Sequence, residues 1–411
     1  MKKFLSLLVA SSFAFYMQAC SDNSTSADDD EIEKVSSSSS ADKAKSSSSK
    51  VKSSSSSVKS SSSKAKSSSS KKVESSSSSE DSYSVYVIGN DYASGDLRWV
   101  DDKGKISKKS ILFGGDSKLC TIDGNIYVLE RTGSDDLVLL NSSREKVWTV
   151  KFDADANPYD VVKANKDEVW VALRGVPKLV KVSVKKGKIT KTVKTDAFAN
   201  GNNPSPELVD LEVSGDTLFA LFQRSTGGWD ATYPAGLLAM YKLDNGDLLD
   251  TIRLAKGNPY GMAFAKGKLY VGSTGGWNAL GTGMDADEAR GIEVVNIAKK
   301  KSSMVVDGTK LGGGVWGFAV DAKNAIAYVA VMATWGVDEP LVEVNLEKKT
   351  VNTISGVSSV GGTIFYDDVS ETLFLGSGAT NSYYTYSAGT LTEIKKATDD
   401  ILPPYGIVVV R

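Results

Sequence analysis

Residues 159–193 read YDVVKANKDEVWVALRGVPKLVKVSVKKGKITKTV, and this stretch decides the fold class. Four short runs within it, at 159–162, 168–172, 179–182 and 189–193, alternate between apolar and polar side chains. Glycine, asparagine, aspartate and lysine residues separate these runs. Alternation with a period of two is the pattern of a half-buried β-strand, and the separating residues favour turns. The stretch therefore predicts four short strands in succession.

The same order of strands recurs along the chain. An aromatic residue directly precedes a small apolar one in the second run of each repeat, at Tyr86, Tyr127, Trp170, Phe219, Tyr270, Tyr328 and Phe374. Successive aromatic residues are 41 to 58 positions apart, which is the length of one four-stranded propeller blade. No stretch has a sustained helical period. We therefore expect an all-β protein, a seven-bladed β-propeller.

The two ends of the repeat region complement each other. The first repeat begins at its second strand, 84–88, whereas the chain ends with the strand-like residues 404–410. This last run, PYGIVVV, matches the first strand of the other repeats. We expect the C-terminal strand to complete the first blade and close the ring, which removes exposed sheet edges.

The repeats resemble those of the YVTN and NHL-type seven-bladed β-propellers. The resemblance is in the motifs Asn157-Pro158-Tyr159-Asp160, Asn258-Pro259-Tyr260-Gly261, Leu269-Tyr270-Val271-Gly272 and Ala327-Tyr328-Val329, and it covers residues 82–411. It implies this architecture but no single activity, because the fold hosts binding proteins, scaffolds, lactonases, hydrolases and electron carriers. Lactonase-like propellers generally rely on histidine or on an acidic metal-binding cluster at the axis, and this chain contains no histidine.

Residues 1–20 have the features of a bacterial secretion signal. Lys2 and Lys3 precede an apolar run over 4–15 that is too short to span a bilayer as a mature helix. The run ends in Met17-Gln18-Ala19-Cys20, which resembles a lipobox, although Met17 replaces the usual leucine and Gln18 the usual small residue. The resemblance implies lipidation of Cys20 and a Gram-negative outer-membrane lipoprotein that faces the cell surface or the periplasm. The alternative is ordinary cleavage after Ala19.

Residues 21–81 are expected to form a disordered linker between this signal and the propeller at 82–411. The segment contains six serine runs, and its 10 basic and 10 acidic side chains balance. It buries too little apolar surface to offset the entropy of ordering it. About 60 flexible residues reach on the order of 40 to 50 Å. The propeller region has 37 basic and 40 acidic side chains, so we expect no nucleic-acid partner.

The composition also narrows the possible chemistry. The absence of histidine excludes Ser/His and Cys/His dyads and two-histidine zinc motifs. Cys120, the only cysteine besides Cys20, lies in an apolar strand pattern that predicts a buried, inert thiol. Neither a cofactor nor a metal site is predicted. An enzyme that uses axial carboxylates such as Asp160 and Glu207, with or without a divalent metal, on a lactone or a polysaccharide stays open as an alternative.

A first set of candidate ligand-binding residues lies at the starts of innermost strands. The set consists of Tyr159, Tyr260, Trp316 and Tyr405. In a propeller, the loop before the innermost strand and the loop between the second and third strands open on the same face. These rings either line a ligand site on that face or only fill the space near the axis.

A second set lies in enlarged loops after the second strands of three successive blades, at 223–235, 272–290 and 332–340. Each loop presents a tryptophan among small polar residues: Trp229, Trp277 and Trp335, with Asp230, Asn278 and Asp338 nearby. Such a surface suits a sugar, whose apolar face stacks on indole while its hydroxyls bind polar groups. It suits a protein hot spot equally well. The alternative is that each tryptophan only pins its own loop.

Together these features predict a monomeric, envelope-anchored binding module. Its ligand would be a carbohydrate or an envelope or extracellular protein, recognised through the tryptophan-rich rim. The alternatives are the histidine-free enzyme described above and a scaffold of an envelope complex.

Overall fold

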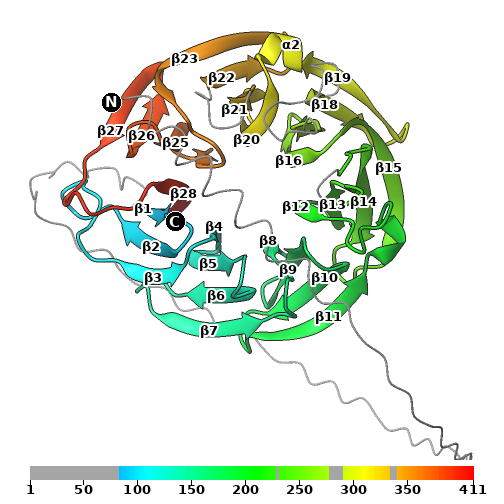
Figure 1. Cartoon of the computed structure of the whole chain (residues 1–411), viewed down its shortest axis with the longest axis horizontal. Coiled ribbons are helices and arrows are strands. Elements are labelled where there is room, and N and C mark those ends of the chain that lie inside the picture. Colours follow the sequence, from blue (N-terminus) through cyan, green and yellow to red (C-terminus); the bar gives the residue numbers. More distant parts are fainter. Residues whose placement is uncertain (1–82, 228–230, 277–289, 334–339) are drawn as a thin grey trace, which may run out of the picture. The chain divides into compact units, whose positions relative to one another are not determined.

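The computed structural model describes residues 83–227, 231–276, 290–333 and 340–411. These residues form seven four-stranded antiparallel sheets arranged as blades around a ring (Figure 1). The helical elements within the described residues are two short segments, η1 (Asp196–Phe198) and α2 (Gly308–Leu311). None of the described helices is long and apolar enough to cross a membrane. The predicted all-β, seven-bladed architecture is confirmed.

Each blade is built from four strands, ordered below from the innermost outward. Blade 1 contains β28 (Pro404–Val410), β1 (Ser84–Asn90), β2 (Ser94–Trp99) and β3 (Ile111–Gly114), and blade 2 contains β4 (Ser117–Ile122), β5 (Asn125–Glu130), β6 (Asp136–Leu140) and β7 (Lys146–Lys151). Blade 3 contains β8 (Pro158–Lys163), β9 (Glu168–Leu173), β10 (Lys178–Ser183) and β11 (Lys188–Lys194), and blade 4 contains β12 (Leu208–Ser214), β13 (Thr217–Phe222), β14 (Ala235–Lys242) and β15 (Leu248–Gly257). Blade 5 contains β16 (Pro259–Ala265), β17 (Lys268–Ser273), β18 (Gly291–Asn296) and β19 (Lys301–Asp307). Blade 6 contains β20 (Gly314–Asp321), β21 (Ile326–Met332), β22 (Pro340–Asn345) and β23 (Thr350–Ser358), and blade 7 contains β24 (Ile364–Asp367), β25 (Thr372–Ser377), β26 (Ser382–Ser387) and β27 (Thr390–Ile394).

The C-terminal strand closes the ring, as predicted. β28 pairs with β1 in an antiparallel register that places Val410 opposite Ser84. The chain terminus is also tied to blade 7, because the Arg411 guanidinium forms an ion pair with Asp367. Blade 1 is thus assembled from both ends of the described chain, and its innermost strand follows the other described strands in sequence.

The repeated aromatic residues of the second strands fill the spaces between blades. Trp170 is fully buried and packs against Leu218 and Phe222 of the next blade. Its indole N–H donates to the carbonyl oxygen of Leu243 at 2.8 Å, so the polar atom of the ring is satisfied as well. Replacing a buried aromatic residue of this kind by alanine typically costs about 3–5 kcal/mol. These residues form the structural core and leave the innermost strands to present a different set of side chains.

Five innermost strands have a β-bulge at the same place, near their first residue. The register shifts there add one extra residue to the innermost strand, which the register passes over: Tyr159, Val209, Tyr260, Trp316 or Tyr405. A bulge bends the strand and redirects the side chain of the extra residue. Three of these bulges follow a non-glycine residue with positive φ: Asn157 at 47°, Glu207 at 57° and Asn258 at 51°. The backbone therefore repeats one device for presenting a side chain near the axis.

Candidate functional site

The starts of the innermost strands and the loops after the second strands lie on one face of the ring, which we name the axial face. Backbone hydrogen bonds join the two kinds of loop within a blade, for example from Arg131 N to Asp116 O at 2.8 Å and from Arg174 N to Asn157 O at 3.0 Å. In blade 5, Thr274 N donates to the carbonyl oxygen just before β16 at 2.9 Å. Side chains at these positions in successive blades are therefore neighbours around the axis.

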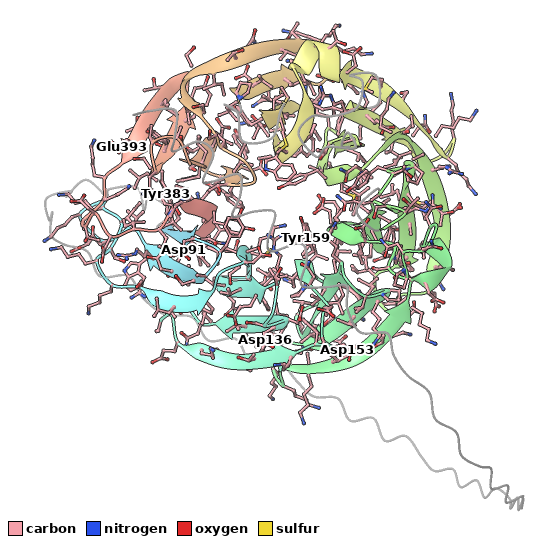
Figure 2. The ribbon with its side chains drawn as sticks, viewed as in Figure 1. Asp91, Asp136, Asp153, Tyr159, Tyr383 and Glu393 are labelled. Atoms are coloured by element: carbon pink, nitrogen blue, oxygen red, sulfur yellow. The ribbon has the colours of Figure 1, made fainter. Side chains whose placement is uncertain are left out.

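Three cationic side chains surround the ring of Tyr159 on this face. The distances to the ring centroid are 5.6 Å from Lys118 Nζ, 4.7 Å from Arg131 Cζ and 5.7 Å from Arg174 Cζ. We name these four residues the cation cluster. Figure 2 shows Tyr159 on the inner side of the ring near its axis, with Asp153, from the segment between β7 and β8, further out. Burial raises the pKa of the Tyr159 hydroxyl, but the positive charges of Arg131, Arg174 and Lys118 outweigh burial and lower it.

Arg131 is held in place by two groups from neighbouring segments. Its guanidinium pairs with the Asp116 carboxylate, and it also donates to the hydroxyl of Tyr405. That hydroxyl in turn donates to Asp116 at 2.6 Å, which links blade 1 to blade 2. Burial raises the pKa of Asp116, but Arg131 and these hydrogen bonds outweigh it and lower the pKa. Tyr92, an exposed ring on the loop between β1 and β2, contacts Tyr405 edge-on at 6.3 Å between centroids.

Arg174 is held by a second network that reaches blades 4 and 5. Its Nη2 donates to Glu207 at 2.9 Å and to the side-chain oxygen of Gln223 at 3.2 Å. The other Glu207 oxygen accepts from Ser225 N at 3.0 Å. The amide nitrogen of Gln223 donates to Pro259 O at 3.2 Å, which turns the amide oxygen towards Arg174. The Arg174 guanidinium is therefore positioned by Glu207 and Gln223, which are themselves held by hydrogen bonds to the backbone.

Carboxyl groups of blades 3 and 4 link successive innermost strands. Asp160 accepts from Leu211 N at 3.0 Å, and Asp210 accepts from Met262 N at 2.6 Å. Burial, and then the charge of Asp160, raise the pKa of Asp210 well above its ordinary value. The same two causes raise the pKa of Glu212 to about 7, although an N–H of the next blade opposes the shift. Asp210 and Glu212 therefore hold protons more readily than ordinary acids do.

Lys118 and Cys120 lie beside these carboxyl groups on β4. Lys118 Nζ donates to the carbonyl oxygen of Tyr159 at 3.2 Å. Burial lowers the pKa of Lys118, but the charge of Asp160 outweighs this and raises it, so the side chain stays cationic. Cys120 is half-buried rather than buried, with Sγ 3.6 Å from Asp160. Burial and the Asp160 charge raise the pKa of the thiol to about 12, which suppresses thiolate chemistry.

The rings of blades 5 and 6 form a separate aromatic pair. The centroids of Tyr260 and Trp316 are 5.7 Å apart and their planes differ by 34°. The Tyr260 hydroxyl extends as far as the start of blade 7, because a Cβ placed on Gly362 would lie 2.5 Å from it. Both rings are half-buried, in contrast to the second-strand aromatic residues. Glycine at 362 therefore leaves room for Tyr260 to cross from blade 5 towards blade 7.

The predicted site residues divide into two groups. Tyr159 and Tyr405 lie in contact with the arginines of the cation cluster, and Tyr260 and Trp316 form the aromatic pair. The remaining predicted residues lie outside the described part of the chain: Cys20, Trp229, Asp230, Trp277, Asn278, Trp335 and Asp338. The three enlarged loops begin on the axial face, because the last residues of β13, β17 and β21 pair with the first residues of the innermost strands. These pairs are Phe222 with Leu208, Ser273 with Pro259 and Met332 with Gly314.

The carboxylates of the alternative enzymatic hypothesis already have partners. Asp160 is engaged by Leu211 N–H and Cys120, and Glu207 by Arg174 and Ser225 N–H. Within the described ranges, no three Asp, Glu or Cys side chains lie together in a way that could hold a metal ion. A separate cavity of about 310 Å³, lined by residues such as Tyr83 and Phe374, involves none of the axial residues named above.

The cationic residues Lys118, Arg131 and Arg174 were not predicted from the sequence. A positional signal was nevertheless present, because Arg131 and Arg174 each follow the repeated aromatic residue of their blade, Tyr127 or Trp170, by four positions. Four residues after that aromatic, the second strand has ended on the axial face. Comparing this position between blades would have found both arginines.

No protein-family model matches the sequence, and no curated protein matches it at a significant level. Solved structures with the same fold include a protein from Lactobacillus plantarum, at a TM-score of 0.55 and 11% identity, covering 80% of this chain and 99% of that one. A candidate 6-phosphogluconolactonase from Bacteroides fragilis matches at 0.53 and 13%, covering 82% and 100%. AztD from Citrobacter koseri, in its apo form, matches at 0.50 and 13%, covering 80% and 97%. At such identities the likeness establishes the propeller fold alone.

Proposed function

We propose that the protein is a binding module whose ligand, a carbohydrate, docks on the axial face of the propeller. The observation that supports this most strongly is the set of aromatic rings at equivalent bulges: Tyr159, Tyr260, Trp316 and Tyr405. Each ring is half-buried, whereas the repeated aromatic residues of the second strands, which serve only the core, are buried. Partly accessible rings among hydrogen-bonding groups match the apolar faces and the hydroxyls of a sugar.

The enlarged loops would extend this surface. Their described ends stand on the axial face of blades 4, 5 and 6, next to the starts of the innermost strands. In the proposal, Trp229, Trp277 and Trp335 supply further stacking surfaces, with Asp230, Asn278 and Asp338 as hydrogen-bonding partners. A protein ligand would use the same rings as a hot spot.

The N-terminal segment motivates the cellular setting of the proposal. Lipidation at Cys20 would anchor the chain to an outer membrane, and residues 21–81 would act as a flexible tether for a monomeric propeller. A tether of this length lets one anchored module search a volume with a radius on the order of 40 to 50 Å. Mass spectrometry of the membrane fraction for a diacylated Cys20 peptide tests this part separately.

The binding proposal is tested with a glycan and polysaccharide screen on the purified chain, followed by calorimetry. We expect Trp316→Ala to weaken binding of the best glycan about tenfold, which corresponds to about 1.4 kcal/mol. Trp99→Ala is the matched control, because Trp99 ends β2 on the opposite face and stacks with Arg144. The proposal fails if no glycan binds, or if both substitutions have the same effect while thermal melting shows both variants folded.

A further inference from the structure

The cation cluster has more hydrogen-bond donors than the protein satisfies. An arginine has five N–H donors and a lysine has three. Lys118 Nζ makes one hydrogen bond within the described residues, to the main chain at Tyr159. Arg174 uses Nε and Nη2 for Gln223 and Glu207, and no described residue accepts from its Nη1. Because both side chains are half-buried on the axial face, the remaining donors face solvent or a ligand.

The nearby acceptors are already occupied. Asp116 is shared by Arg131, Tyr405 and Thr132, and Glu207 by Arg174 and the backbone. Asp160 serves the next innermost strand through the Leu211 N–H. Asp210 likewise accepts from the backbone, and burial raises its pKa so that it holds a proton readily. The unused donors are therefore available to an acceptor from outside the protein.

The two arginines of the cluster are also oriented by hydrogen bonds, as a recognition site requires. Arg131 is fixed by Asp116 and the hydroxyl of Tyr405, and Arg174 by Glu207 and Gln223. Their guanidinium groups flank the Tyr159 ring, which also restrains their orientation. Guanidinium groups held by a second layer of partners are well suited to planar, bidentate binding of carboxylate or phosphate.

Within the described residues, Lys118 links blade 2 to blade 3 through one hydrogen bond only. Unlike Arg131 and Arg174, it forms no ion pair with any described carboxylate, and its single hydrogen bond is to a main-chain oxygen. Ordering a lysine side chain costs conformational entropy. The charge of Asp160 offsets part of the repulsion between Lys118 and the two arginines, and an anion bound between the three cations would offset more of it.

We propose that the ligand of the axial face has a carboxylate or phosphate group, which binds beside Tyr159 between Lys118, Arg131 and Arg174. This inference rests on the proposed function and names the chemical class of its ligand. The anionic group would contact the unused donors of the cation cluster, while the sugar ring to which it is attached extends towards Tyr260 and Trp316.

Two matched pairs of probes test the charge requirement by calorimetry on the full chain. Trigalacturonate is compared with its uncharged methyl ester, and glucose 6-phosphate with glucose. We expect the charged member of at least one pair to bind at least about tenfold more tightly, and the pair that responds distinguishes a carboxylate from a phosphate ligand. The advantage should shrink as NaCl is raised from about 50 to about 500 mM, because salt screens partly exposed charges.

Substitutions locate the effect. Lys118→Met and Arg174→Gln should each lower affinity for the charged probe about tenfold and leave the uncharged partner unchanged. Lys118→Arg should retain most of the binding. The matched control is Arg144→Gln, which removes a cation between β6 and β7 on the opposite face, where it stacks on Trp99. Thermal melting identifies any variant that does not fold.

Three results would overturn the inference. Equal affinity within both probe pairs would show that the ligand needs no anionic group. It would not reject carbohydrate binding, which the glycan screen and Trp316→Ala test independently. Failure to bind any of the four probes would also reject the inference. So would an equal loss of charged and uncharged probes in Lys118→Met and Arg174→Gln, because that pattern indicates a merely structural role.

Discussion

The two sides of the axial face differ in the residue that each innermost strand places at one aligned position. Each comparison uses the innermost-strand residue that pairs with the second-strand residue two positions after the repeated aromatic. In blades 2, 3 and 4 this residue is charged: Lys118, Asp160 and Asp210. Blades 5, 6 and 1 have glycine at the aligned position, namely Gly261, Gly317 and Gly406. We refer to these as the charged side and the glycine side.

The difference shows which features of the ring are structural and which are available for recognition. On the charged side, hydrogen bonds link Asp160 and Asp210 to the next innermost strand. On the glycine side, Gly317 lets the backbone at Gly361 approach closely, and the rings of Tyr260 and Trp316 pair with each other. One bulge pattern thus supports a polar, charged surface beside an aromatic one.

The largest expected effect comes from deleting residues 404–411, which removes β28 from the boundary between the two sides. The deletion exposes the edge of β1 and takes Ile407, Val408 and Val409 out of the core. Burial of each such side chain contributes about 1.5–3 kcal/mol, and the total approaches the roughly 5–15 kcal/mol typical of a whole domain. We expect loss of cooperative unfolding in calorimetry. A cooperative transition within a few degrees of the parent would show that the ring does not depend on this strand.

An intermediate effect is expected from adding a methyl group on the glycine side. A Cβ on Gly317 would overlap the carbonyl oxygen of Gly361, which belongs to the backbone and cannot move aside cheaply. Gly317→Ala should destabilise the fold by about 3 kcal/mol, measured by denaturant unfolding. Gly261→Ala is the control, since its Cβ would lie 3.7 Å from Phe318, an ordinary contact. Equal stabilities of the two variants would contradict the crowding argument.

The smallest effect sharpens the description of the charged side and depends on pH. Glu212 has a folded-state pKa of about 7 against an ordinary value of 4.5, so the folded chain binds more protons between these pH values. Its contribution to stability is therefore complete below pH 4.5 and is lost as the pH rises through about 7. Glu212→Gln should stabilise the fold by about 1–2 kcal/mol at about pH 8 and have little effect at about pH 5.

Melting curves of the parent and the Glu212→Gln variant across this range provide the measurement. Glu347→Gln is a suitable control, because Glu347 is exposed and its partner Lys266 lowers its pKa instead. A gain from Glu212→Gln that is the same at both ends of the pH range would show that the carboxyl is not held in its neutral form.

The fold could be derived from the sequence because its determinants are local and repeated. An aromatic residue such as Trp170 recurs at nearly constant spacing and alternates with polar residues, and both patterns survive in the structure as buried second strands. Ring closure was also predictable, since the strand missing from the first repeat is present at the C-terminus.

The candidate site was predictable only in part. The rings at the starts of innermost strands were found because a turn motif directly before the strand marks the position, as at Asn157-Pro158-Tyr159. The cation cluster was missed because its members come from different blades, Lys118 from an innermost strand and Arg131 and Arg174 from loops. Their proximity depends on ring geometry and side-chain conformation. Cys120 proved half-buried, because it packs against the apolar cluster between blades 2 and 3 while its Sγ lies beside Asp160.

The pairing of Ser84 with Val410 has a consequence for biogenesis. During translation, β1 emerges first and must wait for more than 300 further residues before its partner exists. Throughout that interval the nascent chain exposes an unpaired strand edge, which is a template for pairing with another molecule. Final sealing involves the greatest sequence separation in the domain, so we expect it to be the slow step of folding and the stage at which chaperones matter most.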